Sequence, residues 1–429
     1  MTMKIGIIGA GLSGLTSALA LAKNGHYVEV FHKESEPGGL IGSFDFEGCR
    51  LEHFYHFLCA GDDGYFDLCE ELGLKAHLRF ARARTGFFYE GRSYPLSTPI
   101  DLLRFDAVPW MQRLRFGLFA LEARWRNEWR QLDAIAAKPW LIDRIGLRAY
   151  EVIWEPLLSL KFGAFHEHIS AAWVWHRLHR VARSKNRMGY LEGGSQRLVD
   201  ALLNQLRRHK VSLHLERPVA KILTDEGGRQ TVGLRFDAGG DFACDHVVST
   251  VPLPVLADLL PEGWDDYAGQ LRKIQYIGVV CVVFKLKRSV SPYFWYNVND
   301  ARAPFNGIIE YTNLVPPDAS GGHIVYVPYY VPVDHPIYRM SDEAVVRQSW
   351  EGLQQVQPRL RDQDVLARHV ARAPYAQAIC PTGFLNMMPE HQSPLEGLYL
   401  LDSTFLYPED RTQSGHILRA RACAEALTP

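Results

Sequence analysis

Three glycines near the start of the 429-residue chain have a spacing that suits phosphate chemistry. Gly9, Gly11 and Gly14 form the pattern Gly-x-Gly-x-x-Gly between a β-rich run and an Ala/Leu-rich run. The first glycine permits a tight turn, the second lets the backbone approach a diphosphate, and the third lets a helix pack close to a strand. Leu12 and Ser13 begin the following helix, whose free N–H groups would face the phosphates. The segment predicts a dinucleotide site, and a tight turn without a ligand is the structural alternative.

The end of the next strand is the second place where such a site makes contact. An acidic residue there normally binds the ribose hydroxyls. In this chain the strand ends Val30-Phe31-His32-Lys33-Glu34, so a histidine stands at the acidic position. Two alternatives remain: His32, with Lys33 beside it, is the hydrogen-bond partner, or Glu34 takes the role with a shifted geometry. A solvated strand end is the structural alternative for Glu34.

These residues require a strand, a helix and a second strand, which the pattern places at 4–8, 13–24 and 27–32. Later segments of the same kind and an intervening helical and β-rich part predict an α/β fold with a Rossmann-like nucleotide-binding domain assembled from discontinuous segments. An α+β substrate domain, made of a helical insert and an antiparallel sheet, is inserted into it. The further strands are expected near 211–215, 219–223, 232–236, 246–250, 276–286, 308–311, 324–330 and 397–401, and helices over 101–187, over 196–209 and from 413. The expected boundaries are 1–65, 188–265 and 386–429 for the nucleotide-binding domain, and 66–187 and 266–385 for the substrate domain.

Composition excludes several classes of protein. With 47 basic and 48 acidic residues the net charge is −1, which argues against a polybasic nucleic-acid-binding protein. No uninterrupted apolar run reaches the length that a spanning helix needs. The 7 cysteines form neither a CxxC pair nor a Cys/His cluster, so we expect reduced thiols, no metal site and a cytoplasmic location. The apolar run after Lys4 is interpreted as the first strand and not as a signal peptide.

The segment Gly38-Gly39-Leu40-Ile41-Gly42-Ser43 carries a family resemblance. Together with the first glycine motif it resembles the flavin-dependent amine oxidase superfamily, which includes monoamine oxidases, protoporphyrinogen oxidase and phytoene desaturases. In that family an Arg-x-Gly-Gly segment wraps the FAD, which implies that Gly38, Gly39, Leu40 and Ser43 bind the cofactor. The arginine position is occupied by Glu36, a departure like that at His32. We hypothesise that the two compensate, an imidazole facing a carboxylate.

Other segments extend the resemblance over nearly the whole chain. Residues 189–198 resemble the Gly-Gly-x-x-x-Leu turn that begins a helix of the FAD-binding domain, and 247–252, which include Thr250, resemble a strand that ends near the cofactor. Val219 resembles the residue that contacts the adenine through its backbone. Asp402 and the helix near Ser414 resemble the final FAD motif, in which an acidic side chain and a helix terminus meet the cofactor. A capping role is the structural alternative for Asp402. The resemblance implies noncovalent FAD, because no flavin-attaching cysteine is recognised.

Three residues are candidates for the catalytic neighbourhood. His56 matches a histidine of UDP-galactopyranose mutase, and its imidazole could bond the flavin or donate a proton; a satisfied core histidine is the alternative. Lys161 could hold a water or assist proton transfer if burial lowers its pKa, whereas a snorkelling surface lysine is the alternative. Tyr375 resembles the aromatic residue near the flavin in amine oxidases.

Two groups of basic residues in the helical part bear on the substrate. Three interpretations are open for them: a clamp on an anionic substrate, contact with an anionic membrane surface, or a solvated helix face whose arginine stems cover the core. A nucleic-acid role has no supporting motif. The first group is Arg177, Arg180, Arg183, Lys185 and Arg187, and the second is Arg113, Arg115, Arg124, Arg126 and Arg130, interleaved with aromatic residues.

The resemblance implies an FAD-dependent oxidoreductase that takes a hydride from a small or lipid-like substrate, because the flavin itself carries the redox chemistry. The alternative is a non-redox flavoenzyme similar to UDP-galactopyranose mutase, acting on a sugar nucleotide. A third interpretation is an FAD-binding protein without turnover. The substrate, the electron acceptor and the oligomeric state are not determined by these motifs.

Overall fold

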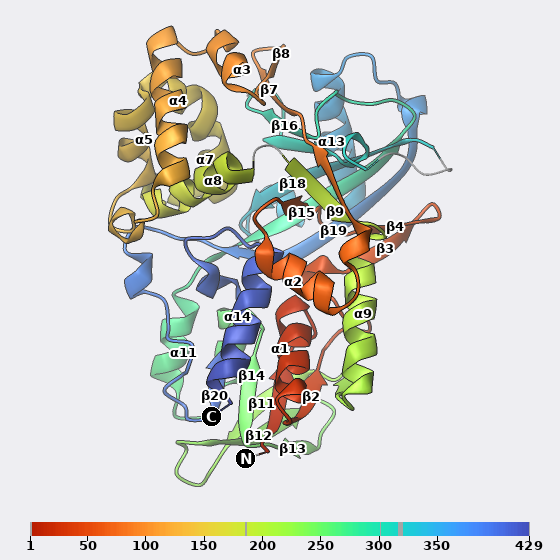
Figure 1. Cartoon of the computed structure of the whole chain (residues 1–429), viewed down its shortest axis with the longest axis vertical. Coiled ribbons are helices and arrows are strands. Elements are labelled where there is room, and N and C mark those ends of the chain that lie inside the picture. The colour runs from red at the N-terminus through yellow and green to blue at the C-terminus, as the bar shows by residue number, and fades with distance from the viewer. Residues whose placement is uncertain (1, 185–186, 301, 316–320, 429) are drawn as a thin grey trace.

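The computed structural model describes residues 2–184, 187–300, 302–315 and 321–428 (Figure 1). Its first layer is a five-stranded parallel sheet in the order β10-β2-β1-β14-β20, with strands taken from segments far apart in the sequence. The strands are β1 (Lys4–Ile8), β2 (Tyr27–Phe31), β10 (Ser212–His214), β14 (His246–Ser249) and β20 (Leu398–Leu400). An α/β domain assembled from discontinuous segments is therefore confirmed.

Alternate side chains of β1 pack on opposite layers, as the period of a strand requires. Ile5 and Ile7 pack with the helices α1 and α14 in one core, whereas Ile8 belongs to the core on the other face. On the face of the parallel sheet that carries Ile8, a three-stranded antiparallel meander covers the sheet. The helices are α1 (Leu12–Lys23), α2 (Asp63–Glu71), α9 (Gly194–Arg208) and α14 (Gln413–Ala426); the meander strands are β11 (Val219–Thr224), β12 (Thr231–Phe236) and β13 (Asp241–Ala243).

A seven-stranded mixed sheet in the order β19-β15-β18-β17-β16-β7-β8 forms the second large layer. The expectation of a fully antiparallel sheet is wrong at one place, because β16 pairs with β7 in parallel. Val280, Val282 and Phe284 of β15 pack against α13, while Val279, Cys281 and Val283 face the other core. The strands are β7 (Thr85–Tyr89), β8 (Arg92–Pro95), β15 (Tyr276–Leu286), β16 (Trp295–Val298), β17 (Gly307–Glu310), β18 (His323–Val331) and β19 (Val365–Ala378). Helices α12 (Pro336–Arg339) and α13 (Asp342–Val356) pack against this sheet, whereas α10 (Leu253–Leu259) packs with α11 (Asp265–Arg272) and with β11.

A helical body lies at the end of this sheet, opposite the chain termini (Figure 1). It comprises α3 (Pro99–Arg104), α4 (Trp110–Trp125), α5 (Ala137–Ile145), α6 (Leu147–Ala149), α7 (Glu155–Phe162) and α8 (Ala171–Ser184). Two small sheets join the layers: β3 (Ser43–Phe46) with β4 (Cys49–Glu52), and β5 (Leu58–Cys59) with β9 (Arg187–Leu191) and β6 (Leu78–Arg82). None of the helices in the described ranges is long and apolar enough to cross a membrane.

Glu310, at the end of β17, is fully buried, and its burial predicts how the stability of the fold depends on pH. Its carboxylate accepts hydrogen bonds from the Ser291 N–H at 2.8 Å and the Val290 N–H at 3.2 Å, yet burial raises its pKa from 4.5 to about 7. The folded state therefore keeps a proton that the unfolded chain releases. Between pH 4.5 and about 7 the free energy of unfolding falls as the pH rises, by up to about 3 kcal/mol from this residue.

We expect Glu310→Gln to remove this part of the pH dependence, measured by urea unfolding at a series of pH values. Glu351→Gln, at an exposed position on α13, is the matched control and should follow the wild-type profile. A Glu310→Gln profile parallel to that of the wild type would contradict the assignment.

Candidate active site

The glycine-rich turn after β1 has the geometry that its sequence predicts. Gly9 has a φ of 106°, in the region that favours glycine, and its N–H donates to the Phe31 carbonyl at 2.8 Å. A Cβ on Gly14 would lie 1.9 Å from the Gly9 carbonyl oxygen, so the third glycine is needed for close packing of helix and strand. The Thr250 hydroxyl fixes the turn from β14 by donating to the Ile8 carbonyl at 2.9 Å.

The N-terminus of α1 is open. Its N-cap is Gly11, which gives no side-chain cap, and the first turn contains no acidic residue. A Cβ on Gly11 would meet only the Gly38 carbonyl oxygen, at 4.0 Å, so space lies in front of the backbone N–H groups of Leu12 and Ser13. These groups and the helix dipole favour an anion at this position.

The N-terminus of α14 lies beside that of α1. The Ser13 hydroxyl is hydrogen-bonded to His416 Nδ1 at 2.9 Å, which ties the first turns of the two helices together. Thr412 caps α14 by accepting the Gly415 N–H at 2.9 Å, and Ser414 is buried next to it. The structure thus brings the first and last predicted cofactor motifs to one place.

His32 is half-buried at the end of β2 and supports the glycine turn. Its Nδ1 accepts the Ala10 N–H at 3.3 Å, and burial lowers its pKa. Glu36 does not face it: the Glu36 side chain is 71% exposed and lies 3.6 Å from Arg50, so the proposed compensation between His32 and Glu36 is wrong. Lys33 and Glu34 are exposed and form an ion pair at 3.3 Å.

Val219, at the start of β11, lies near this strand end because the Arg217 N–H donates to the His32 carbonyl at 2.8 Å. On the other side of the turn, the Gly38 N–H donates to the Ala10 carbonyl at 2.8 Å. This bond holds the second glycine segment, with Gly39 and Leu40 in a short 3₁₀ turn and Ser43 buried on β3, against the first. The roles of these residues toward a cofactor stay predictions.

Asp402 is buried after β20, and its carboxylate is already engaged. It accepts the Thr404 N–H at 2.8 Å and the Tyr276 hydroxyl, and burial raises its pKa. The capping alternative is therefore realised. Tyr375, on β19, contacts Tyr276 edge to face with a ring-centroid distance of 5.6 Å, so it lies toward Asp402.

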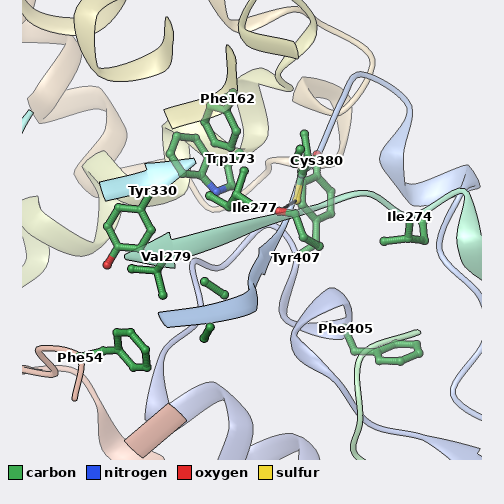
Figure 2. Close-up of a cluster of buried hydrophobic side chains, with 14 of the residues drawn as sticks. Phe54, Phe162, Trp173, Ile274, Ile277, Val279, Tyr330, Cys380, Phe405 and Tyr407 are labelled. Carbon is green, nitrogen blue, oxygen red and sulfur yellow. Dashed lines mark hydrogen bonds between the residues drawn. The ribbon is translucent and has the colours of Figure 1, made fainter. Parts of the chain in front are cut away.

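Lys161 is buried on α7 with an exposed fraction of 4%, which excludes the snorkelling alternative. Its amine lies 4.9 Å from the ring centroids of Trp173 and Tyr330 and 5.6 Å from that of Phe162. Figure 2 shows Phe162 and Trp173 together on the helical side of β15, with Tyr330 beside them. We call Lys161 and these three rings the lysine cage. Burial lowers the pKa of the Lys161 amine to about 7.

A second cation, Arg411, lies next to Tyr330 of the lysine cage. The Arg411 guanidinium lies 4.5 Å from the Tyr330 ring centroid and donates to the Tyr330 hydroxyl, which in turn donates to the Tyr55 hydroxyl at 3.1 Å. Tyr330 and Asp410 keep the pKa of Arg411 above its usual value although burial opposes its charge. Sequence motifs did not single out Arg411, Tyr330 or Tyr55.

Of the first basic group, Arg177 and Arg180 reach this region from α8. Arg177 pairs with Asp410 at 2.5 Å and Arg180 with Asp62 at 3.0 Å. Lys161 and Arg177 hold the pKa of the Asp410 carboxyl below its usual range, against the effect of burial. Arg183 is exposed, as is Arg187 on β9, and Lys185 lies outside the described residues.

His56 is close enough to Arg411 and His416 to feel their charges, and it is itself uncharged. Burial lowers its pKa to about 3, and the positive charge of Arg411 contributes in the same direction. Its Nδ1 is buried without a hydrogen-bond partner among the described residues. A neutral imidazole can give or accept a hydrogen bond, but it cannot act as an imidazolium acid near neutral pH.

The whole-chain comparison agrees with this geometry. The family model of flavin containing amine oxidoreductases matches residues 12–403. The chain belongs to this family. It is therefore an FAD-dependent oxidoreductase, and FAD is its cofactor.

The relatives of this flavin containing amine oxidoreductase include two carotenoid desaturases. A zeta-carotene desaturase from Synechocystis sp. is 25% identical over 313 residues, and the match covers 65% of this chain but only 64% of that relative. A 15-cis-phytoene desaturase from Synechococcus elongatus is 22% identical over 464 residues, covering 99% of this chain and 96% of the relative.

Solved structures share the fold over the full length. A putative protoporphyrinogen oxidase from Exiguobacterium sp. 255-15 has a TM-score of 0.79 at 18% identity and covers 100% of this chain and 99% of its own. Reduced UDP-galactopyranose mutase has a TM-score of 0.79 at 17% identity and covers 99% of this chain and 95% of its own.

The residues present fit FAD. Gly11 leaves space where a diphosphate needs it, the α1 N-terminus is uncapped, and His32 Nε2 is buried without a partner among the described residues. Across the described ranges, no group of three or more His, Cys, Asp or Glu side chains could hold a metal ion.

Proposed function

We propose that the protein oxidises a small or lipid-like substrate by hydride transfer to noncovalently bound FAD. The observation that carries this proposal is the lysine cage. A buried amine with a pKa of about 7 stands between aromatic rings beside Arg411 and the N-terminus of α14. The three parts of the chain that we assign to separate domain segments meet here, since Lys161, Tyr330 and Arg411 come from 66–187, 266–385 and 386–429.

In this reaction a C–H bond of the substrate breaks and its electron pair leaves with the hydrogen. FAD, when bound, supplies the hydride acceptor. Lys161 in its neutral form accepts at Nζ the proton released from the neighbouring atom, and the substrate gains a double bond. An amine with a pKa near the working pH is suited to this role because a large part of it is unprotonated. The aromatic walls keep water from the amine.

The cage also limits the class of substrate. Its walls are aromatic and its fixed charges are positive, since the Arg177 guanidinium is matched by Asp410 while Arg411 donates to a neutral phenol. A protonated amine would be repelled by the Arg411 guanidinium, because the Lys161 amine in its neutral form leaves that charge as the nearest one to the rings. An apolar molecule, with or without an anionic group, fits better, and the carotene and phytoene desaturases among the relatives support a lipid-like substrate.

Anaerobic bleaching of the flavin absorbance by a panel of compounds tests the proposal. The panel should contain polyprenoids, apolar carboxylic acids, amines and sugar nucleotides. We expect polyprenoids or apolar acids to bleach the flavin, and amines to leave it oxidised. If no compound of any class bleaches it, the oxidoreductase proposal for these substrates fails.

A mutase-like activity on a sugar nucleotide is the second candidate. It is favoured by one observation: two tyrosine hydroxyls, of Tyr55 and Tyr330, and the guanidinium of Arg411 form a connected group that could bind a diphosphate. Such an activity would require a prereduced flavin and would consume no electron acceptor. Turnover of a sugar nucleotide only after reduction with dithionite would support this candidate against the first.

A further inference from the structure

Helix α4 exposes apolar side chains along its whole length. Their exposed fractions range from 46% to 71%, which is unusual for six large apolar residues on one helix. We call them the α4 stripe: Trp110, Met111, Leu114, Leu118, Leu121 and Trp125. The adjoining α3 adds Ile100 and Leu103, which are 60% and 50% exposed.

The α4 stripe lies opposite the face with which the helix joins the protein. The buried residues of α4 are Phe119 and Ala123, and the Ala123 carbonyl accepts a hydrogen bond from His179 of α8 at 2.7 Å. With about 100° of rotation per residue, the stripe falls within an arc of about 100° centred on the opposite side. One apolar face therefore holds α4 in the helical body, and a second one points away from it.

Arginines border the stripe on both sides. By the same rotation, Arg113 and Arg124 flank one edge and Arg115 flanks the other. Arg113 and Arg115 donate to backbone carbonyls, and Arg124 lies 5.3 Å from the Trp125 ring centroid. Within the described part of the chain, none of the three has a carboxylate at ion-pair distance. Glu122, the acidic residue of α4, is already engaged with Arg126 and Arg144.

We propose that the α4 stripe docks on an anionic lipid bilayer, with the helix lying in the plane of the membrane interface. Large apolar residues at the centre, tryptophans at both ends and unmatched arginines at the edges are what such an interface attracts. A second copy of this chain is a poorer partner, because two α4 stripes facing each other would place like-charged arginine borders together.

The position of α4 connects the docking surface with the site described above. Helix α8 packs against α4 and carries Arg177 and Arg180 into the charged group around Asp410. In Figure 1, α3 and α4 lie at the end of the molecule away from both termini and from α1 and α14. A bilayer at this end would contact the helical body and leave the FAD-binding layer in water.

Vesicle flotation of the FAD-loaded full-length chain tests the docking. We expect it to float with vesicles of phosphatidylcholine plus phosphatidylglycerol, and to float less with phosphatidylcholine alone or at high salt. Leu118→Glu should weaken binding at least about tenfold, because it puts a charge in the centre of the apolar face. Arg104, in the last turn of α3, is also exposed. Arg104→Gln combined with Arg124→Gln should weaken binding to the anionic vesicles about tenfold or more at low salt.

Leu366→Glu is the matched control, because Leu366 is 46% exposed on β19, outside the helical body. It should float like the wild type, and flavin absorbance and circular dichroism should show that every variant is folded. Equal flotation of Leu118→Glu and wild type would overturn the proposal, and so would the absence of wild-type flotation. A dimer in analytical ultracentrifugation that Leu118→Glu dissociates, without vesicle binding, would assign the stripe to a second copy instead.

Discussion

Gly11→Val is expected to give a folded but colourless protein. The backbone at Gly11 has φ −76° and ψ −177°, an extended conformation that valine adopts without strain, and a Cβ there meets nothing closer than 4.0 Å. The side chain would instead fill the space before the α1 N-terminus, where the diphosphate of FAD must approach the backbone. We expect the dissociation constant for FAD to rise at least about hundredfold, which is about 2.7 kcal/mol.

Equilibrium titration of the apoprotein with FAD measures this effect. Gly11→Ala should give a smaller loss. Gly61→Val, at an exposed glycine where a Cβ would have nothing within 4 Å, should bind as the wild type does. The thermal melting of the apo forms should be similar for the Gly11 variants and the wild type. Wild-type affinity in Gly11→Val would show that the diphosphate does not lie over this helix.

Lys161→Met is expected to slow anaerobic flavin reduction by roughly 10²- to 10⁴-fold, the range of a lost general base. In the wild type the reduction rate should rise with pH through about 7, because the neutral amine is the active form and its pKa lies there. The variant should lose this inflection. Stopped-flow absorbance at a series of pH values, with a substrate that bleaches the wild type, measures both effects.

Two further variants test whether the rate depends on proton transfer to Lys161 or only on a positive charge at this position. Lys161→Arg keeps a cation that does not lose its proton, so it should be slow at every pH. Lys138→Met, at a lysine on α5 that pairs with Glu167 at 2.7 Å, is the control and should keep the wild-type profile. A Lys161→Met enzyme that keeps the rate and the inflection would remove Lys161 from the chemistry.

The sequence predicted a strand or turn well where a single local pattern, such as an apolar run or a glycine motif, determines that element. The apolar run at 276–286 became β15 (Tyr276–Leu286) with the same limits, because every residue after its first is buried and both neighbouring strands pair with it. The glycine turn was equally clear, since close packing admits no Cβ at Gly14. The mixed character of the large sheet was less visible, because β7 pairs with β16 from more than 200 residues away.

The candidate site was only partly predictable because its side chains meet through long-range packing. Lys161 was singled out, but its burial depends on Trp173 and Tyr330 from two other elements. Arg411 and Tyr330 belong to no motif of their own. The available signal for Arg411 was its position directly before the final helix. A cation next to a helix N-terminus is electrostatically unfavourable, so an arginine at this position suggests a functional role.

The two basic groups show why composition alone could not settle their roles. Both are rich in arginine and aromatic residues, yet Arg177 and Arg180 enter the site with carboxylate partners while Arg113, Arg115 and Arg124 border an exposed face. Whether an arginine reaches the site or the exposed surface depends on which face of its helix packs against the rest of the protein. For α4 that face is fixed by α8, whose His179 donates to the Ala123 carbonyl of α4.

Acid precipitation of the purified wild-type protein, followed by a measurement of flavin in the supernatant, tests whether the chain holds FAD without a covalent bond. We expect about one FAD per chain in the supernatant, because the cofactor is held without a covalent bond, and we expect the apoprotein to bind FAD again on reconstitution. A colourless protein that cannot be reconstituted with FAD would show that no dinucleotide binds at the α1 N-terminus. Flavin that stays with the precipitate would contradict its noncovalent attachment.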